Sequence, residues 1–178
     1  MFFRVVKPLF PLIPLGLAAV VLVTFILGSI RTRRGRPRRE AFTSAMLDVL
    51  AGASLISVLV LTLPRSIEAH RSMEVIPFRE SFHDSTRTAE TVANVILFVP
   101  LGIFAPACWA NIDRWRRVLL GAVTLSLAIE VAQFLLKLGR QASITDVILN
   151  TVGAAIGYSV LRAGRWLRRY RTKVTRVA

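Results

Sequence analysis

Long apolar stretches alternate with short polar segments along the whole chain. Five stretches are long enough to cross a hydrocarbon layer of about 30 Å, which requires about 20 helical residues. They are Leu9–Ile30, Ala45–Leu63, Val92–Trp109, Val118–Leu136 and Ile144–Leu161. The pattern predicts an all-α fold, a polytopic transmembrane helix bundle with about five spanning helices.

The first apolar stretch is predicted to be a retained helix rather than a signal peptide. Six arginines follow it at once within residues 31–39, and no cleavage site of small residues precedes them. We therefore expect three parts: an N-terminal helix with a basic loop over residues 1–40, a four-helix membrane domain over 45–162, and a basic tail over 163–178.

Composition narrows the class of protein further. Apolar types make up 54% of the 178 residues, and 24 Lys and Arg against 10 Asp and Glu give a net charge of +14. These values exclude a disordered chain, a disulfide scaffold and a fibrous repeat. The charge alone would fit nucleic acid or an anionic membrane, but the apolar stretches favour the lipid bilayer as partner and argue against nucleic acid.

The distribution of basic residues predicts the orientation in the membrane. Sixteen of the 24 Lys and Arg fall in segments 31–39, 111–117 and 162–178. Basic loops stay on the cytoplasmic side, so we expect an outside N-terminus and a cytoplasmic C-terminus. The three tryptophans, Trp109, Trp115 and Trp166, would then lie near the inner interface.

The basic tail has two interpretations that the sequence leaves open. Trp166, Tyr170, Val174 and Val177 recur at helical spacing among arginines and a lysine. Such a segment could lie on anionic lipid. It could equally be a frayed tail that only sets topology.

Polar residues inside the predicted spans gather toward the outer side. Glu130 is an ionisable residue within a span, and Gln133 shares its helix face. Under the predicted orientation, seven polar residues map to the outer third or the outer loops. They are Arg79, Asn94, Glu130, Gln133, Arg140, Asp146 and Asn150. We expect them to form a polar, ligand-binding pocket on the extracytoplasmic side.

The start of the last span carries structural signals. Ser143 and Asp146 have the spacing of a capping box, so a capping role explains Asp146 without any chemistry. Asn150 is expected to make an interhelical hydrogen bond. Gly153 and Gly157 form a pair of small residues that allows close helix approach.

No metal or cofactor is expected. His70 and His83 lie 13 residues apart in the long outer loop and are predicted to be solvated side chains. The lone Cys108, near the inner end of the third span, is expected to be a small buried apolar residue rather than a reactive thiol.

An ordered set of motifs resembles the VanZ-like family of small bacterial membrane proteins. The motifs are Val-Ile-Pro-Phe-Arg at 75–79, Asn94-Val-Ile-Leu-Phe98-Val-Pro100-Leu-Gly102, Ile129-Glu130-Val-Ala-Gln133, Arg140, and Asp146-Val-Ile-Leu-Asn150-Thr-Val-Gly153. The resemblance covers roughly residues 45–162. It implies a role in the cell envelope, since the family's namesake is associated with antibiotic resistance to teicoplanin.

Three activities fit this sequence unequally. The first is a non-catalytic protein that binds a lipid-linked envelope precursor or another anionic headgroup, with Arg79 and Arg140 holding the phosphate or carboxylate. The second is a membrane enzyme with Glu130 and Asp146 as an acid/base pair, but no nucleophile with a nearby base is evident and no catalytic residue is assigned. A transporter is the weakest, because no inverted repeat is present. The oligomeric state is left open.

Overall fold

The computed structural model describes residues 13–62, 73–74, 85–135 and 142–174, and within these the chain is almost entirely helical. The five long helices are α2 (Ile13–Arg33), α3 (Arg38–Thr62), α4 (Ser85–Cys108), α5 (Trp115–Leu135) and α6 (Ile144–Val174). A short 3-10 turn, η2 (Ala110–Ile112), joins α4 to α5. Each long helix contains an apolar window long enough to cross a membrane. The predicted fold class is confirmed.

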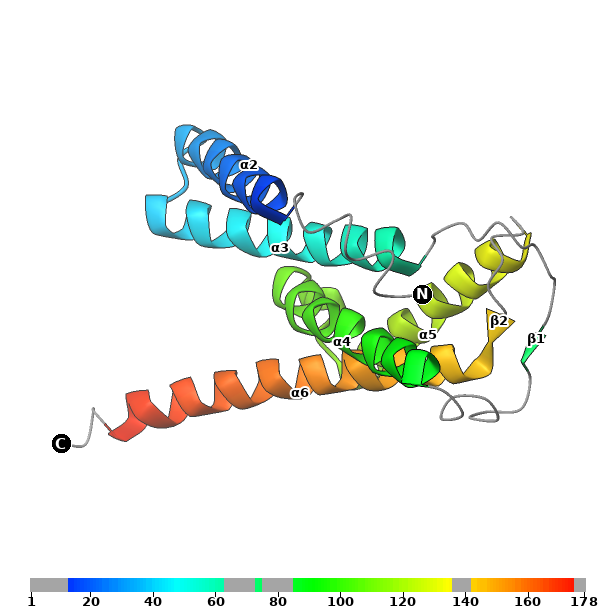
Figure 1. The fold of residues 1–178 in the computed structure, drawn as a ribbon. Coiled ribbons are helices and arrows are strands. Elements are labelled where there is room, and N and C mark those ends of the chain that lie inside the picture. The colour runs from blue at the N-terminus through cyan, green and yellow to red at the C-terminus, as the bar shows by residue number, and fades with distance from the viewer. Residues whose placement is uncertain (1–12, 63–72, 75–84, 136–141, 175–178) are drawn as a thin grey trace.

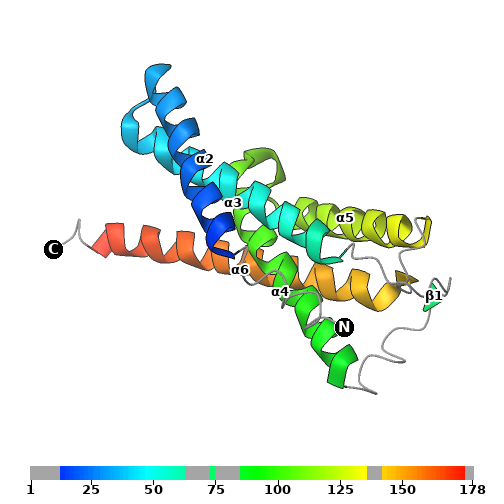
Figure 2. The same ribbon diagram turned by 45° about the horizontal axis from the view of Figure 1, so that its top comes forward.

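The helices pack as a chain of neighbours around α4. The most extensive pairs are α4 with α6, α2 with α3, α3 with α4, and α5 with α6. Figure 1 shows α3 and α6 on opposite sides of α4, with α2 resting on the outer side of α3. In Figure 2, α4 crosses α6, whose C-terminal part runs on beyond the other helices. This arrangement leaves α2 attached to the bundle mainly through α3.

The pairing of α4 and α6 depends on glycine. A Cβ atom added at Gly153 or Gly157 would overlap the carbonyl oxygen of Val95 or Val99 in α4, and one at Gly102 would overlap Ala154 in α6. The two backbones are therefore closer than any other side chain would permit. The sequence prediction that Gly153 and Gly157 serve close helix packing is confirmed.

The turn between α2 and α3 ends one helix and begins the next within four residues. Gly35 has a positive φ of 88°. Its N–H donates to Thr32 O at 3.0 Å, and the Arg36 N–H donates to Arg31 O at 3.1 Å. These two bonds form a Schellman motif, which satisfies the last carbonyls of α2. Pro37 follows and accepts the first bond of α3 from the Ala41 N–H.

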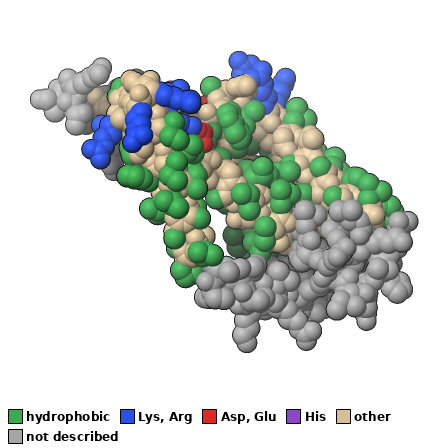
Figure 3. Space-filling view, turned by 90° about the horizontal axis from the view of Figure 1, so that it is seen from above, with side chains coloured by type: hydrophobic (Ala, Val, Ile, Leu, Met, Phe, Trp, Pro, Cys, Tyr) green, Lys and Arg blue, Asp and Glu red, His purple; other side chains and the backbone are tan. Residues whose placement is uncertain are grey.

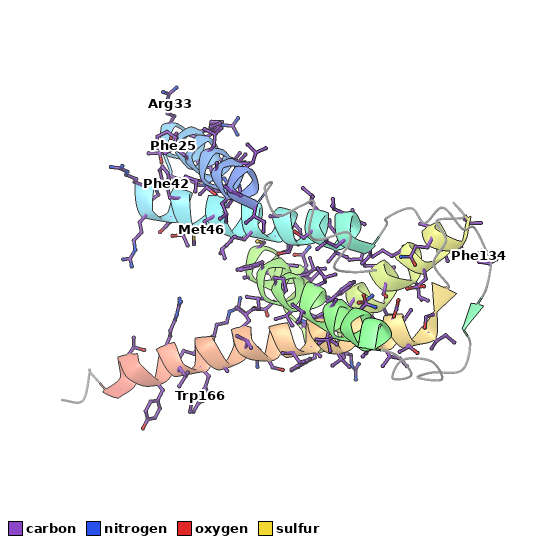
Figure 4. All side chains as sticks on the ribbon, in the orientation of Figure 1. Phe25, Arg33, Phe42, Met46, Phe134 and Trp166 are labelled. Atoms are coloured by element: carbon purple, nitrogen blue, oxygen red, sulfur yellow. The ribbon has the colours of Figure 1, made fainter. Side chains whose placement is uncertain are left out.

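The core lies where α3, α4, α5 and α6 meet. Its largest fully buried side chains are Tyr158, Phe98 and Val58. Apolar side chains also cover the outside of the bundle, as expected for helices surrounded by lipid, and Figure 3 shows them along the helices in that view. On α2 only Gly28 is buried, against the ring of Phe42. Phe25 and Phe42 face each other between α2 and α3, with ring centroids 6.1 Å apart (Figure 4).

One small strand pair departs from the all-helical pattern. Strands β1 (Met73–Glu74) and β2 (Ala142–Ser143) pair in parallel, with Met73 opposite Ala142. The pair ties the segment before α4 to the start of α6. It brings two connections that are far apart in sequence to the end of the bundle where the predicted polar residues lie.

Candidate functional site

One face of α5 carries three buried polar side chains. Ser126, Glu130 and Gln133 stand at positions i, i+4 and i+7, with exposed fractions of 0%, 6% and 2%. Each makes a hydrogen bond to a different element, namely α6, β2 and α3. We call these three residues and their partners Asn150, Ser143 and Thr62 the polar seam. It joins α3, α5 and α6 at the end of the bundle opposite the arginine loop.

The carboxylate of Glu130, a residue of α5, lies beside the start of α6. Its Oε2 atom accepts a hydrogen bond of 2.8 Å from the backbone N–H of Ser143. Ser143 Oγ in turn accepts a bond of 3.2 Å from the Thr145 N–H. Ser143 therefore caps the helix as predicted, but the reciprocal bond of a capping box comes from Glu130 on α5 rather than from Asp146. A carboxylate in this position also interacts favourably with the positive end of the α6 dipole.

Gln133 joins α5 to the end of α3. Its Nε2 atom donates to the backbone oxygen of Thr62 at 2.6 Å. A carbonyl oxygen can only accept, so the orientation of this amide is determined. The other amide atom, Gln133 Oε1, is buried and has no hydrogen-bond partner. It is an unused acceptor inside the bundle.

Asn150 and Asn94 add further unused amide atoms. Asn150 Nδ2 donates to Ser126 Oγ at 2.8 Å, which confirms the predicted interhelical bond, while its Oδ1 has no partner. Asn94 is 4% exposed, and its Nδ2 also has no partner. Asn94 lies on α4 next to Val95. The carbonyl oxygen of Val95 is close to Gly153, which follows the seam residue Asn150 on α6 by about one turn. Of the four buried polar atoms without a partner in the described chain, only Thr24 Oγ1 lies elsewhere.

The structure describes five of the seven residues of the predicted pocket. Asn94, Glu130, Gln133 and Asn150 are buried toward the same end of the bundle. Asp146 lies half-buried in the first turn of α6. Arg79 and Arg140 lie outside the described residues, so the anion-holding role expected of them stays a prediction.

Three residues of the seam were not predicted as site residues. Ser126 stands four residues before Glu130, so the same helical spacing that grouped Glu130 with Gln133 could have found it. Ser143 was expected only as a cap. Thr62 contributes its backbone oxygen, and a backbone contact 71 residues away in the chain leaves no mark in the sequence.

The opposite end of the bundle holds two ion pairs that the sequence did not reveal. Arg31 at the end of α2 contacts Asp48 of α3 at 2.5 Å and Ser44 at 2.8 Å. Asp113, after η2, accepts bonds from Arg165 at 2.5 Å and from the Tyr158 hydroxyl at 3.0 Å. At this end of the bundle α2 and α4 end, α3 and α5 begin, and most of the arginines are found. We call it the basic end. Its carboxylates fasten the helices to one another.

The described residues hold no other obvious chemistry. No group of three or more His, Cys, Asp or Glu gathers in the part of the chain that the structure covers. His70 and His83 lie outside it. Cys108 is half-buried at the end of α4, next to Asp48.

Comparison with known proteins assigns the chain to a family. The profile of the VanZ/LLP1 family matches residues 17–167. The match is longer than the stretch of 45–162 that carries the recognised motifs, and it includes α2. Neither a curated protein nor a solved structure matches the chain significantly. With five helices suited to crossing a membrane, the chain is a multi-pass membrane protein that belongs to the VanZ/LLP1 family.

Proposed function

We propose that the protein is a non-catalytic binding protein of the bacterial cell envelope. The polar seam and Asn94 receive the headgroup of a lipid-linked precursor or another anionic lipid. The seam opens toward the extracytoplasmic face of the plasma membrane, with the N-terminus outside and the C-terminus in the cytoplasm. A role of the type associated with glycopeptide resistance is one form that such binding could take.

The unused amide atoms carry this proposal. A buried polar atom without a partner costs about 1–3 kcal/mol. Three such atoms, Asn94 Nδ2, Gln133 Oε1 and Asn150 Oδ1, lie toward one end of the bundle. A ligand that both donates and accepts hydrogen bonds would satisfy them, as hydroxyl, amide and phosphate groups of an envelope headgroup do. Helix packing alone gives no reason to keep them unpaired.

Orientation follows from the basic end. Arg31, Arg33, Arg34, Arg36, Arg38 and Arg39 lie at or beside the α2–α3 turn, and Arg114, Arg116 and Arg117 lie at the start of α5. Figure 3 shows the blue side chains gathered at one end of the molecule. The positive-inside rule assigns that end to the cytoplasm and hence the seam to the outside.

The role of Glu130 favours binding over catalysis. An acid/base pair of Glu130 and Asp146 would need a carboxyl group free to exchange protons with a substrate. Glu130 instead accepts the backbone N–H at the start of α6, a bond that needs an acceptor oxygen throughout. We therefore assign Glu130 to shaping the site rather than to acid/base chemistry.

Lipid retention tests the proposed function. The full chain is extracted from its native membrane into polymer nanodiscs, and bound lipids are identified by mass spectrometry. Asn94→Leu removes an unused donor without breaking a described hydrogen bond, and we expect it to lose the enriched headgroup. Ser57→Ala is the matched control, because Ser57 is exposed and bonds only within α3. An unchanged lipid profile in Asn94→Leu would contradict the proposal.

A further inference from the structure

Helix α6 is longer than a membrane span requires. It runs without a break from Ile144 to Val174, 31 residues, or about 45 Å at 1.5 Å per residue. A hydrocarbon layer of about 30 Å needs only about 20 of them. The last three turns, residues 163–174, continue beyond the other helices near the basic end, as Figures 1 and 2 show.

The exposed side of α6 is apolar along its whole length. Within the span, the exposed residues follow at four-residue steps: Ile144, Ile148, Val152, Ile156 and Val160. Past the span, the exposed apolar residues are Trp166, Leu167 and Tyr170. At 100° per residue, the mean directions of the two groups, with Ala163 placed by position in the second, differ by about 10°. The surface that faces lipid in the span therefore continues into the tail.

The arginines of the tail stand on the other side of the helix. The mean direction of Arg162, Arg165, Arg168 and Arg169 lies about 140° from that of the apolar residues. Arg165 bonds to Asp113, so this side faces the bundle at its first turn. Figure 4 shows Trp166 pointing away from the other helices, and its ring stacks on Tyr170 with centroids 5.7 Å apart. The sequence contains no Asp or Glu after Asp146 to offset the charge.

The length of the apolar surface matches the membrane and its headgroups. From Ile144 to Tyr170 the helix rises about 39 Å. This exceeds the hydrocarbon layer but lies just within the 40–45 Å that includes both headgroup regions. Trp166 and Tyr170 thus fall at headgroup depth, where aromatic side chains are favoured. The neighbouring arginines then lie at the level of the lipid phosphates.

We propose that the last three turns of α6 bind anionic phospholipid headgroups in the leaflet at the basic end. The aromatic pair sits among the headgroups, and Arg168 and Arg169 contact their phosphates. The exposed apolar side chains of the tail point in nearly the same direction around the helix axis as those of the span. This favours lipid over a soluble protein partner, because only a tail that faces lipid has to keep the direction of the span's lipid-facing side. Of the two interpretations that the sequence left open, this proposal adopts lipid contact.

The test uses the full chain with a single tryptophan. Trp109→Phe with Trp115→Phe leaves Trp166 as the only reporter. The protein is reconstituted in phosphatidylcholine vesicles that contain brominated phosphatidylcholine or brominated phosphatidylglycerol at equal mole fraction. We expect both lipids to quench Trp166 and phosphatidylglycerol to be preferred. Arg169→Gln should lower this preference by up to about fivefold, the factor equivalent to about 1 kcal/mol per basic residue.

A second reporter separates the tail from the span. Ile148→Trp, with the three native tryptophans replaced by Phe, places the fluorophore on the same stripe about 27 Å from Trp166, in the opposite leaflet. It should be quenched equally by both brominated lipids. Equal quenching of Trp166 by the two lipids would overturn the anionic preference. A lack of quenching by either lipid would overturn lipid contact altogether and indicate a helix that projects into water or onto a protein.

Discussion

Replacing Glu130 by Ala or by Gln distinguishes the structural bond of this carboxylate from a chemical role. The Ala variant leaves the Ser143 N–H buried without an acceptor, which costs about 1–3 kcal/mol. It also removes a negative charge from the start of α6, worth about 0.3–1 kcal/mol. Glu130→Gln keeps an acceptor oxygen and loses only the charge. We therefore expect about 1–4 kcal/mol of destabilisation for Ala and less than about 1 kcal/mol for Gln.

Thermal unfolding in detergent measures this difference. For a chain of 150–250 residues, 1 kcal/mol shifts Tm by about 2–4 °C. Glu130→Ala should therefore lower Tm by about 3–16 °C and Glu130→Gln by less than about 4 °C, with Ser57→Ala unchanged. Equal losses for Ala and Gln would refute the reasoning, because they would show that the charge and not the acceptor matters. Retained stability with abolished function in the Gln variant would instead favour an acid/base role.

Three further predictions concern other parts of the bundle. Gly157→Leu should prevent α4 and α6 from packing and abolish the peak of the folded protein in size-exclusion chromatography, because its side chain would overlap the α4 backbone. Gly164→Ala in the same helix, with open space around it, should instead raise Tm slightly, since Ala is about 1 kcal/mol better than Gly within a helix. Asp113→Ala should lower Tm by several degrees and Asp113→Asn by less, because Asn keeps an acceptor for the Tyr158 hydroxyl but loses the charge that pairs with Arg165. Asn94→Leu should leave Tm unchanged or raise it while bound lipid is lost, and a large drop in Tm would show that Asn94 is a packing residue.

The spans could be predicted from the sequence because burial in lipid leaves a strong signal. Apolar runs of about 20 residues are the condition for crossing a membrane. The helices nevertheless extend beyond those runs. Helix α3 begins at Arg38, seven residues before the predicted span, because Gly35 and Pro37 end α2 and start α3 in a tight turn. Hydropathy does not record such local backbone geometry.

The polar site could be predicted in part. Helical spacing grouped Glu130 with Gln133 and placed Asn150 for an interhelical bond, and the structure shows these residues buried toward one end. That Glu130 rather than Asp146 accepts the Ser143 N–H could not be predicted, because that bond joins two helices across a connection. The Asp113 contacts with Tyr158 and Arg165 span 45 and 52 residues and depend on tertiary packing alone.

The basic end is richer in specific contacts than its composition suggested. Sequence reasoning treated its arginines as determinants of topology. Arg31 and Arg165 each pair with a carboxylate, so part of this charge holds helices together as well. Both pairs are partly exposed, and each is expected to add at most about 1 kcal/mol. Their main consequence is to fix α2 on α3 and the η2 turn on α6.

An experimental structure of the full chain in nanodiscs drawn from its native membrane would show whether the polar seam and Asn94 hold a lipid headgroup. We expect density for a headgroup within hydrogen-bonding distance of Gln133 Oε1 and Asn94 Nδ2, on the side of the membrane away from the arginines. Those two amides closed off by apolar side chains, with no ligand or water against them, would contradict it.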